Sequence, residues 1–277
     1  MKFKTAAELS INKLFHYTSF TKPERLARVF TEKTIYCSNP NDFNDPWDCR
    51  PCFNKETLND PKEYDRIVKW FIRCGSKNNS TLSEKEHEQR EQELRSNRSL
   101  LEFMIDEMTS DMEKAIQSQY RVFCMSIHPD SPLMWSHYGN KHQGICLEFS
   151  VQNSLFCSAL QVDYMNSYPI FNLYENDEYE NLKPLISKSC MWSYEDEFRL
   201  VTADLPYAFP NVPQSKNGFV SLPNEALKSV IIGCQMTEKD RDIVNSLVLK
   251  SGWNVPLKEA RKIPNRYELE INPLLIC

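Results

Sequence analysis

Residues 191–201, MWSYEDEFRLV, carry much of the chemistry in this chain and predict a strand at the centre of its fold. Alternate residues of a strand share a face, so Glu195, Glu197 and Arg199 are expected to point the same way. The intervening apolar residues would then face a hydrophobic core. Two carboxylates beside an arginine are a common means of driving carboxylate pKa values apart, so we interpret this strand as the candidate catalytic element.

Composition limits the classes of protein to which the chain can belong. It has 277 residues, a hydrophobic fraction of 41% and a net charge of −5, which suit one large folded domain. The net negative charge argues against extensive non-specific binding to DNA, but it is compatible with a local basic groove. No apolar run approaches the roughly 18 residues of a membrane span, and the first residues lack the apolar core of a signal peptide. We therefore expect a cytoplasmic protein without a membrane partner.

The ten cysteines are scattered, and without an export signal they are expected to be reduced thiols. Cys49 and Cys52 form a Cys-x-x-Cys pair, but no second pair follows at the spacing of a zinc site. His128, His137 and His142 are spaced more like hydrogen-bonding residues than like metal ligands. No metal site is therefore assigned, and the sequence contains no phosphate-loop, zinc-protease or nucleophile-elbow motif.

Local patterns outside residues 191–201 predict a mixture of strands and helices. Ser83 and Glu86 form a capping box at the start of a strongly charged helix. Strands are expected at 14–17, 34–38, 121–126, 144–149, 160–164, 229–233, 254–257 and 266–271; helices are expected after Thr21, within 60–120, at 131–139, before Lys188 and after Thr237. The sequence thus predicts an α+β fold, a single domain over 1–277 with a mainly helical insertion at 55–120.

The segment NPNDFNDPWD, residues 39–48, is dense in turn-forming residues and yet contains two aromatic side chains. Exposed linkers rarely carry residues such as Phe43 and Trp47 together. We therefore expect an ordered loop that packs on the body of the protein.

Two aromatic stretches are open to both structural and functional interpretations. His16 and Tyr17 lie near the end of the first predicted strand, where they could satisfy backbone groups or hold the ribose and ring of a ligand. Residues 134–138 have the spacing of a helix, and such aromatic stripes are more often core than ligand-binding surface. Ser136, His137 and Tyr138 place three polar side-chain ends in a row, which is unusual for a stretch that lies wholly in a hydrophobic core.

Together these segments resemble a bacterial protein family known only as a domain of unknown function. Its pattern runs Ser-x-Pro-x-x-Phe-Asn-Asp-Pro-x-Asp, Met-Trp-Ser-His-Tyr, Gly-x-x-Leu-Glu-Phe and Trp-x-x-Glu-x-Glu-x-Arg. The matching positions here are 38–48, 134–138, 144–149 and 192–199, and the resemblance extends over roughly 14–233. It implies a family without implying a reaction.

The order of a first-strand His-Tyr-Thr, a β-type run with Tyr36 and a late Glu-x-Glu also resembles the ADP-ribosyltransferases. This resemblance implies a split-sheet body and NAD as the co-substrate. It assigns the adenosine ribose to His16 and stacking on nicotinamide to Tyr36 or Tyr138. It assigns binding of the nicotinamide ribose hydroxyl to Glu197 or Glu195.

The chemistry of ADP-ribosyl transfer is compatible with these residues. Cleavage of the nicotinamide–ribose bond passes through an oxocarbenium-like state that one carboxylate stabilises, while a second takes the proton of the attacking nucleophile. Arg199 would bind the pyrophosphate or keep Glu197 ionised. The predicted catalytic residues are Glu197, Glu195 and Tyr138; the predicted cofactor-binding residues are His16, Tyr17, Tyr36, Ser38, Asn44, Asp45, Trp135, His137 and Arg199.

The leading hypothesis is an NAD-dependent ADP-ribosyltransferase, a toxin or defence effector that acts on a protein or nucleic acid. One alternative is a metal-dependent nuclease or other hydrolase that uses the carboxylates of Asp42, Asp45, Asp48, Glu195 and Glu197. A second is a non-catalytic ligand sensor with a pocket lined by Trp135, Tyr138 and Trp192. The sequence leaves the acceptor and the oligomeric state open.

Overall fold

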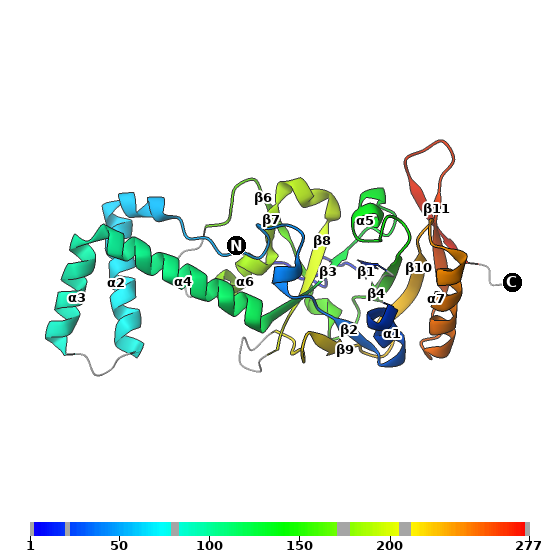
Figure 1. Cartoon of the computed structure of the whole chain (residues 1–277), viewed down its shortest axis with the longest axis horizontal. Helices are drawn as coiled ribbons and strands as arrows, with labels where there is room; N and C mark the ends of the chain where they lie inside the picture. Colours follow the sequence, from blue (N-terminus) through cyan, green and yellow to red (C-terminus); the bar gives the residue numbers. More distant parts are fainter. Residues whose placement is uncertain (1–2, 20–22, 79–82, 171–177, 205–211, 275–277) are drawn as a thin grey trace.

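The fold is built on an eight-stranded mixed sheet that curls along its length (Figure 1). The computed structural model describes residues 3–19, 23–78, 83–170, 178–204 and 212–274. The strand order is β12-β11-β10-β4-β1-β3-β8-β5, in which β10 and β11 pair in parallel and the remaining neighbours pair antiparallel. The predicted α+β class is confirmed.

The elements have the following bounds. The large sheet contains β1 (Lys13–Thr18), β3 (Tyr120–Ser126), β4 (Ile145–Ser150), β5 (Leu160–Gln161), β8 (Glu197–Ala203), β10 (Leu227–Ile232), β11 (Leu257–Lys262) and β12 (Leu269–Pro273). Two small sheets pair β2 (Thr34–Tyr36) with β9 (Phe219–Ser221), and β6 (Asp163–Met165) with β7 (Ser187–Ser189). The α-helices are α1 (Pro23–Thr31), α2 (Pro61–Asn78), α3 (Glu84–Ser96), α4 (Arg98–Gln119), α5 (Pro132–His137), α6 (Glu178–Ile186) and α7 (Glu238–Lys250). Short 3-10 helices are η1 (Pro40–Asp42), η2 (Lys55–Asn59), η3 (Phe156–Ser158) and η4 (Cys190–Glu195).

Both faces of the central strands are buried, because helices cover the sheet on either side. On β1, Leu14 packs with residues of α1 and α7 in one core cluster, whereas Phe15 and Tyr17 pack with Trp135 of α5 in another. Every residue of β8 is buried. A charged side chain on such a strand must find its partners inside the protein, since an unpaired buried charge is very costly.

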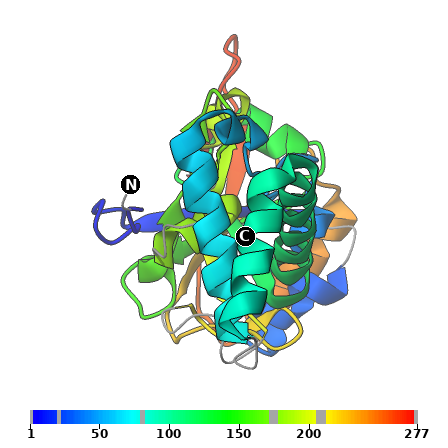
Figure 2. The ribbon, with the colours of Figure 1, turned by 90° about the vertical axis from the view of Figure 1, so that its left-hand side faces the viewer.

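Helices α2, α3 and α4 form an arm at one end of the molecule (Figure 1). Seen from that end, the three helices stand side by side in front of the sheet (Figure 2). The arm has a hydrophobic core of its own, made of Leu58, Ile67, Val68, Leu94, Leu101 and Ile105. Because α4 runs directly into β3, the arm is joined to the sheet at the strand beside β1.

Three predicted helix starts are confirmed by their capping bonds. Ser83 and Glu86 form the reciprocal capping box. Ser131 accepts a hydrogen bond from the Met134 N–H at the start of α5, and Thr237 accepts one from the Asp240 N–H at the start of α7. The predicted cap Thr21 lies outside the described residues. These bonds are local, which is why the sequence is sufficient to predict them.

Some predicted boundaries are wrong. The strand expected at 160–164 is two short strands, β5 and β6, that belong to different sheets. The strand expected at 254–257 begins only at Leu257, where pairing with Val230 of β10 starts. The strand expected at 266–271 likewise begins later, at Leu269. Helix α2 continues through Gly75 to Asn78, because one interior glycine costs a helix only about 1 kcal/mol.

The loop at 39–48 packs on the body through one of its two aromatic side chains. Phe43 packs against the core cluster around Val122 and Val201. Trp47, however, has 68% of its surface exposed. Its indole is therefore an open aromatic surface.

Two glycines with opposite surroundings give the first testable prediction. A Cβ on Gly144 would collide with the backbone carbonyl oxygens of Thr18 and Gly139, whereas a Cβ on Gly75 would meet nothing within 4 Å. Gly144→Ala is therefore expected to destabilise the fold by about 1–3 kcal/mol, as overpacking does. Gly75→Ala is its matched control and should stabilise helix α2 by about 0.5–1 kcal/mol. Urea unfolding measures both; equal effects of the two substitutions would contradict the close approach at Gly144.

Candidate functional site

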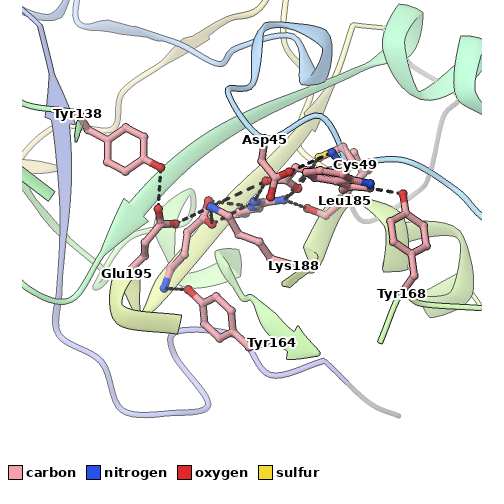
Figure 3. Close-up of polar contacts among 12 residues, drawn as sticks. Asp45, Cys49, Tyr138, Tyr164, Tyr168, Leu185, Lys188 and Glu195 are labelled. Atoms are coloured by element: carbon pink, nitrogen blue, oxygen red, sulfur yellow. Dashed lines mark hydrogen bonds and ion pairs between the residues drawn. The ribbon is translucent and has the colours of Figure 1, made fainter. Parts of the chain in front are cut away.

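Five buried charged residues meet inside the protein, and we refer to them as the charged cluster. They come from the loop after η1, from β7, from η4 and from β8 (Figure 3). The members are Asp48, Lys188, Glu195, Glu197 and Arg199, and each side chain is no more than 5% exposed.

Arg199 is the centre of the charged cluster and is completely buried. Its Nη1 and Nη2 donate to the two carboxylate oxygens of Asp48 at 2.8 and 2.6 Å. Its Nε and Nη2 donate to the two oxygens of Glu197 at 2.8 and 3.0 Å, and Nη1 also donates to the Leu185 carbonyl at 2.8 Å. All five N–H groups of the guanidinium thus have protein partners. Arg199 therefore holds two carboxylates and has no donor left for a ligand.

Lys188 links the two glutamates. Its Nζ donates to Glu195 at 2.5 Å and to Glu197 at 3.0 Å, and it lies 3.9 Å from Asp48. With two cations against three carboxylates, the charged cluster would carry a net negative charge if every group were ionised. Close like charges in a buried site push the pKa values of its carboxyl groups apart.

The two glutamates differ in pKa as such a site requires. Burial opposes ionisation of Glu197, but the neighbouring Arg199 and Lys188 outweigh it and lower the pKa of Glu197 to about 2. Burial, reinforced by the charge of Glu197, raises the pKa of Glu195 above its usual value despite the contact with Lys188. Carboxyl groups whose pKa values are pushed apart are typical of acid–base pairs in active sites.

Glu195 is not on the strand, contrary to the prediction that it shares a face of one strand with Glu197 and Arg199. It is the last residue of η4, and β8 begins at Glu197. Asp196 between them has a left-handed conformation, with φ 41°, that turns the chain. The alternation of a strand therefore applies to Glu197 and Arg199 alone, and Glu195 reaches Lys188 from the turn.

A cavity of about 370 Å³ opens beside the charged cluster, and we call it the first cavity. Tyr138, the residue that follows α5, donates its hydroxyl hydrogen to Glu195 at 2.6 Å within this cavity. Burial, together with the negative charge of Glu195, raises the pKa of Tyr138, so this hydroxyl stays a donor. Predicted site residues that line the first cavity are His16, Tyr17, Ser38, Asn44, His137, Tyr138, Glu195, Glu197 and Arg199.

His16 presents a neutral imidazole to the first cavity. Its Nδ1 lies 2.8 Å from the Cys124 carbonyl oxygen, and its ring stacks on Phe123 with centroids 4.0 Å apart. A carbonyl oxygen only accepts, so Nδ1 carries the hydrogen and Nε2 is left as an acceptor. Burial lowers the pKa of His16 to about 4, although the bond to Cys124 opposes the shift. His16 is thus suited to accept a hydrogen bond from a ligand hydroxyl.

Three predicted cofactor-binding residues do not line the first cavity. Tyr36 lies on β2 and packs against Phe219, with ring centroids 5.2 Å apart. Trp135 is fully buried and donates its Nε1–H to the Pro129 carbonyl at 2.8 Å. Asp45 lines a neighbouring cavity and accepts a hydrogen bond from the Trp47 N–H at 3.0 Å.

Lys188 is the residue that sequence reasoning missed. It was expected only near the end of a helix, whereas it lies on β7, which the parallel pairing with β6 places beside η4. One lysine among the 33 lysines and arginines of this chain carries no local signal that it is buried. Asp48 was recognised as part of the turn-rich loop. Its pairing with Arg199 was not predicted, because the two residues are 151 positions apart in the sequence.

The carboxylates proposed for a metal-dependent hydrolase are not gathered as ligands. Asp48, Glu195 and Glu197 are each bound to Lys188 or Arg199. Within the part of the chain that the structure describes, no group of three or more His, Cys, Asp or Glu side chains could hold a metal ion. Across those same residues, no helix is both long and apolar enough to cross a membrane.

The pKa of Glu197 leads to a second prediction, on acid stability. Because folding lowers this pKa from about 4.5 to about 2, its contribution is present above pH 4.5 and is lost as the pH falls through about 2. The shift corresponds to about 3 kcal/mol, since one pKa unit is about 1.4 kcal/mol. The Glu197→Gln variant should therefore be less stable than the native chain at pH 6. The free energies of unfolding of the two proteins should become equal near pH 2. Denaturant unfolding across this range measures the difference, and a difference independent of pH would contradict the assignment.

Comparison with known proteins matches part of the chain to a family and indicates no activity. No curated protein and no solved structure matches this chain. Nothing in the comparisons supports the resemblance to ADP-ribosyltransferases. The resemblance to a family of unknown function is confirmed over a shorter stretch than expected: residues 134–200, which contribute Tyr138, Lys188, Glu195, Glu197 and Arg199 to the site, match the family described as Protein of unknown function (DUF2971).

Proposed function

We propose that the chain is an NAD-dependent ADP-ribosyltransferase acting on a protein or nucleic acid, with the first cavity as its active site. One observation carries the proposal. His16 of β1, Tyr138 at the end of α5 and the Glu195–Glu197 pair come from distant parts of the sequence but line the same cavity. These are the residue types that the resemblance to ADP-ribosyltransferases assigns to the ribose, the nicotinamide ring and the reacting sugar.

The first cavity has complementary surfaces for a nicotinamide riboside. Phe43, Phe123 and Tyr138 supply aromatic walls for the nicotinamide ring, and His16 supplies an acceptor for a ribose hydroxyl. A reacting sugar beside Glu197 would have an ionised carboxylate next to its developing positive charge. The pyrophosphate role weighed for Arg199 is not part of the proposal, because its donors are already used; it keeps Glu197 ionised instead.

In the proposed reaction Glu197 stabilises the positive charge on the sugar, and Glu195 takes the proton of the acceptor. The bond between C1′ of the ribose and the nicotinamide nitrogen breaks, and its electron pair leaves with nicotinamide. The acceptor nucleophile forms the new bond to C1′, and its proton passes to Glu195. A carboxyl group with a raised pKa is closer to the operating pH and is better suited to proton transfer. On this proposal the curled sheet is the counterpart of the split NAD-binding sheet.

Incubation with NAD labelled on its adenine side, alone and with bacterial lysate, RNA or DNA, tests this proposal. Release of nicotinamide with transfer of label to a macromolecule is the expected result, and the labelled fraction identifies the acceptor class. The proposal fails if nicotinamide is not released under any condition and NAD does not shift the thermal unfolding midpoint.

A non-catalytic ligand sensor is the second candidate, and the saturation of the charged cluster favours it. Every carboxylate in it already has a cationic partner, as in a purely structural network. Of the aromatic residues weighed for a sensor pocket, Tyr138 lines the first cavity, whereas Trp192 lies with His137 and Tyr194. A sensor would bind NAD, or another ligand, without releasing nicotinamide.

A further inference from the structure

A second cavity of about 190 Å³ lies on the other side of the charged cluster. It shares Asp48 and Lys188 with the first cavity, so the two cavities are separated by that pair of side chains. Its volume is below the roughly 300–1,000 Å³ of sites for drug-sized ligands and suits a single small ring system. The function proposed above makes no use of this space.

Trp47 lines the second cavity while remaining 68% exposed. Its backbone is held from two sides. Its N–H donates to Asp45 at 3.0 Å, and its carbonyl accepts the hydroxyl hydrogen of Tyr168 at 3.1 Å. The same hydroxyl lies 3.0 Å from the carbonyl oxygen of Arg50, so it bridges the two ends of this turn. The indole is therefore an open aromatic surface on a fixed base, which reduces the entropy lost when a ring stacks on it.

Ser187 is a second and independent sign of a ligand. It lines the second cavity, is only 5% exposed, and its hydroxyl finds no hydrogen-bond partner among the described residues. Buried polar groups are nearly always hydrogen-bonded, because leaving one unpaired is costly. The oxygen itself has almost no accessible surface, so a bound molecule with a hydrogen-bonding edge would satisfy this hydroxyl once the serine side chain rotates toward the cavity.

The remaining walls indicate the chemistry of that molecule. Met165, Pro169 and Pro184 provide apolar surfaces, and Asn166 adds a side-chain amide that both donates and accepts. A flat aromatic platform with adjacent donors and acceptors is the arrangement by which proteins hold a nucleobase, through stacking and through contacts to its edge. An aromatic ring without a polar edge would leave Ser187 unpaired.

We propose that the second cavity is a binding site for a nucleobase, stacked on Trp47 and hydrogen-bonded at its edge by Ser187 and Asn166. The base can belong to a free nucleotide or to a single-stranded nucleic acid, because the recognition chemistry is the same. This proposal concerns binding alone and does not rest on the NAD chemistry of the first cavity.

Equilibrium binding to the full chain tests the proposal. The probes are the four ribonucleoside 5′-monophosphates, ten-nucleotide single strands of RNA and DNA, ribose 5-phosphate and N-acetyltryptophanamide. Saturable binding of at least one mononucleotide, with weaker or no binding of ribose 5-phosphate and N-acetyltryptophanamide, is the expected result. Tighter binding of the oligonucleotides than of the free nucleotides identifies the nucleic acid as the source of the base, and the reverse identifies a free nucleotide.

Three variants locate the binding. Trp47→Ala should weaken binding by about 10- to 100-fold, the range found for loss of a stacking aromatic. Ser187→Ala should weaken it by about 5- to 10-fold while leaving the unfolding midpoint unchanged or higher, since an unpaired hydroxyl is removed. Tyr267→Ala is the control, because Tyr267 is an exposed aromatic residue on the β11–β12 connection and should change nothing.

The proposal is overturned by any of three results. These are no saturable binding of any nucleotide at millimolar concentration, equal affinity for ribose 5-phosphate or N-acetyltryptophanamide, and binding that Trp47→Ala leaves unchanged. Failure of NAD turnover would leave this outcome untouched, because the two experiments read different sites.

Discussion

Arg199→Met is expected to lower the free energy of unfolding by about 3–5 kcal/mol, the range for removing one partner from a buried charged pair. The guanidinium is completely buried and binds both oxygens of Asp48 and both oxygens of Glu197. Methionine fills much of the volume but leaves these two carboxylates with Lys188 as their remaining cation. Urea unfolding at pH 7 measures the loss.

Controls separate the network from the general cost of removing an arginine. Arg95→Met removes a guanidinium that is 37% exposed and paired with Asp65 and Glu91 on the arm, and it should cost less than about 1 kcal/mol. Arg199→Lys keeps the charge but loses the bidentate geometry. Its free energy of unfolding should therefore lie between those of the native chain and Arg199→Met. Adding Asp48→Asn to Arg199→Met should recover part of the loss, because one unpaired carboxylate is then removed. Equal losses for Arg95→Met and Arg199→Met would show that the charged cluster is not the desolvated network described here.

Glu195→Gln is expected to reduce the rate of NAD turnover by about 10²- to 10⁴-fold, the usual contribution of a general acid or base. Glutamine keeps the size of the side chain and an oxygen that can accept the hydrogen bond from Tyr138. It cannot take a proton from an acceptor nucleophile. Single-turnover release of nicotinamide measures the effect, and KM for NAD should change much less than kcat.

Glu148→Gln is the matched control for this experiment. Glu148 is also a buried carboxylate paired with lysine, through Lys13 at 2.6 Å and Lys258 at 2.6 Å, but it lies on β4 and does not line the first cavity. Its substitution should affect stability and leave turnover unchanged. Tyr138→Phe should reduce turnover less than Glu195→Gln and should raise the pKa of Glu195 further, because a hydrogen bond to the carboxylate is lost. If Glu195→Gln retains full turnover in a chain that consumes NAD, the assignment of Glu195 is wrong.

The sequence allowed much of the candidate site to be predicted, because most of its residues stand in patterns. His16 lies near the end of an apolar strand, Tyr138 follows a short helix with a clear start signal, and Glu197 and Arg199 alternate with apolar residues. Such patterns depend on neighbours within a few positions. The structure then places these residues around one cavity, although each was identified without knowledge of the others' positions.

Other parts of the site depend on contacts that no local pattern encodes. Lys188 joins the charged cluster only because β7 pairs with β6, and Asp48 joins because its loop folds back onto β8. Glu195 was assigned to the strand because the period of two continues through it, but the left-handed Asp196 interrupts the strand there. Trp47 stands in a loop that was expected to pack on the body, and only the tertiary structure shows that its side chain is exposed and lines the second cavity.

The amino-acid sequence by itself determined the α+β class, the strands β1, β3, β4 and β10 within a residue or two, and the starts of α3, α5 and α7. Alternation of side chains and capping hydrogen bonds act over a few residues, so they can be recognised wherever they occur. Only the tertiary structure decided the order of the eight strands, the partners of the buried charges and the two cavities. Those features arise from contacts between residues up to 151 positions apart, and one sequence does not reveal which of many lysines, arginines and carboxylates will meet once water is excluded.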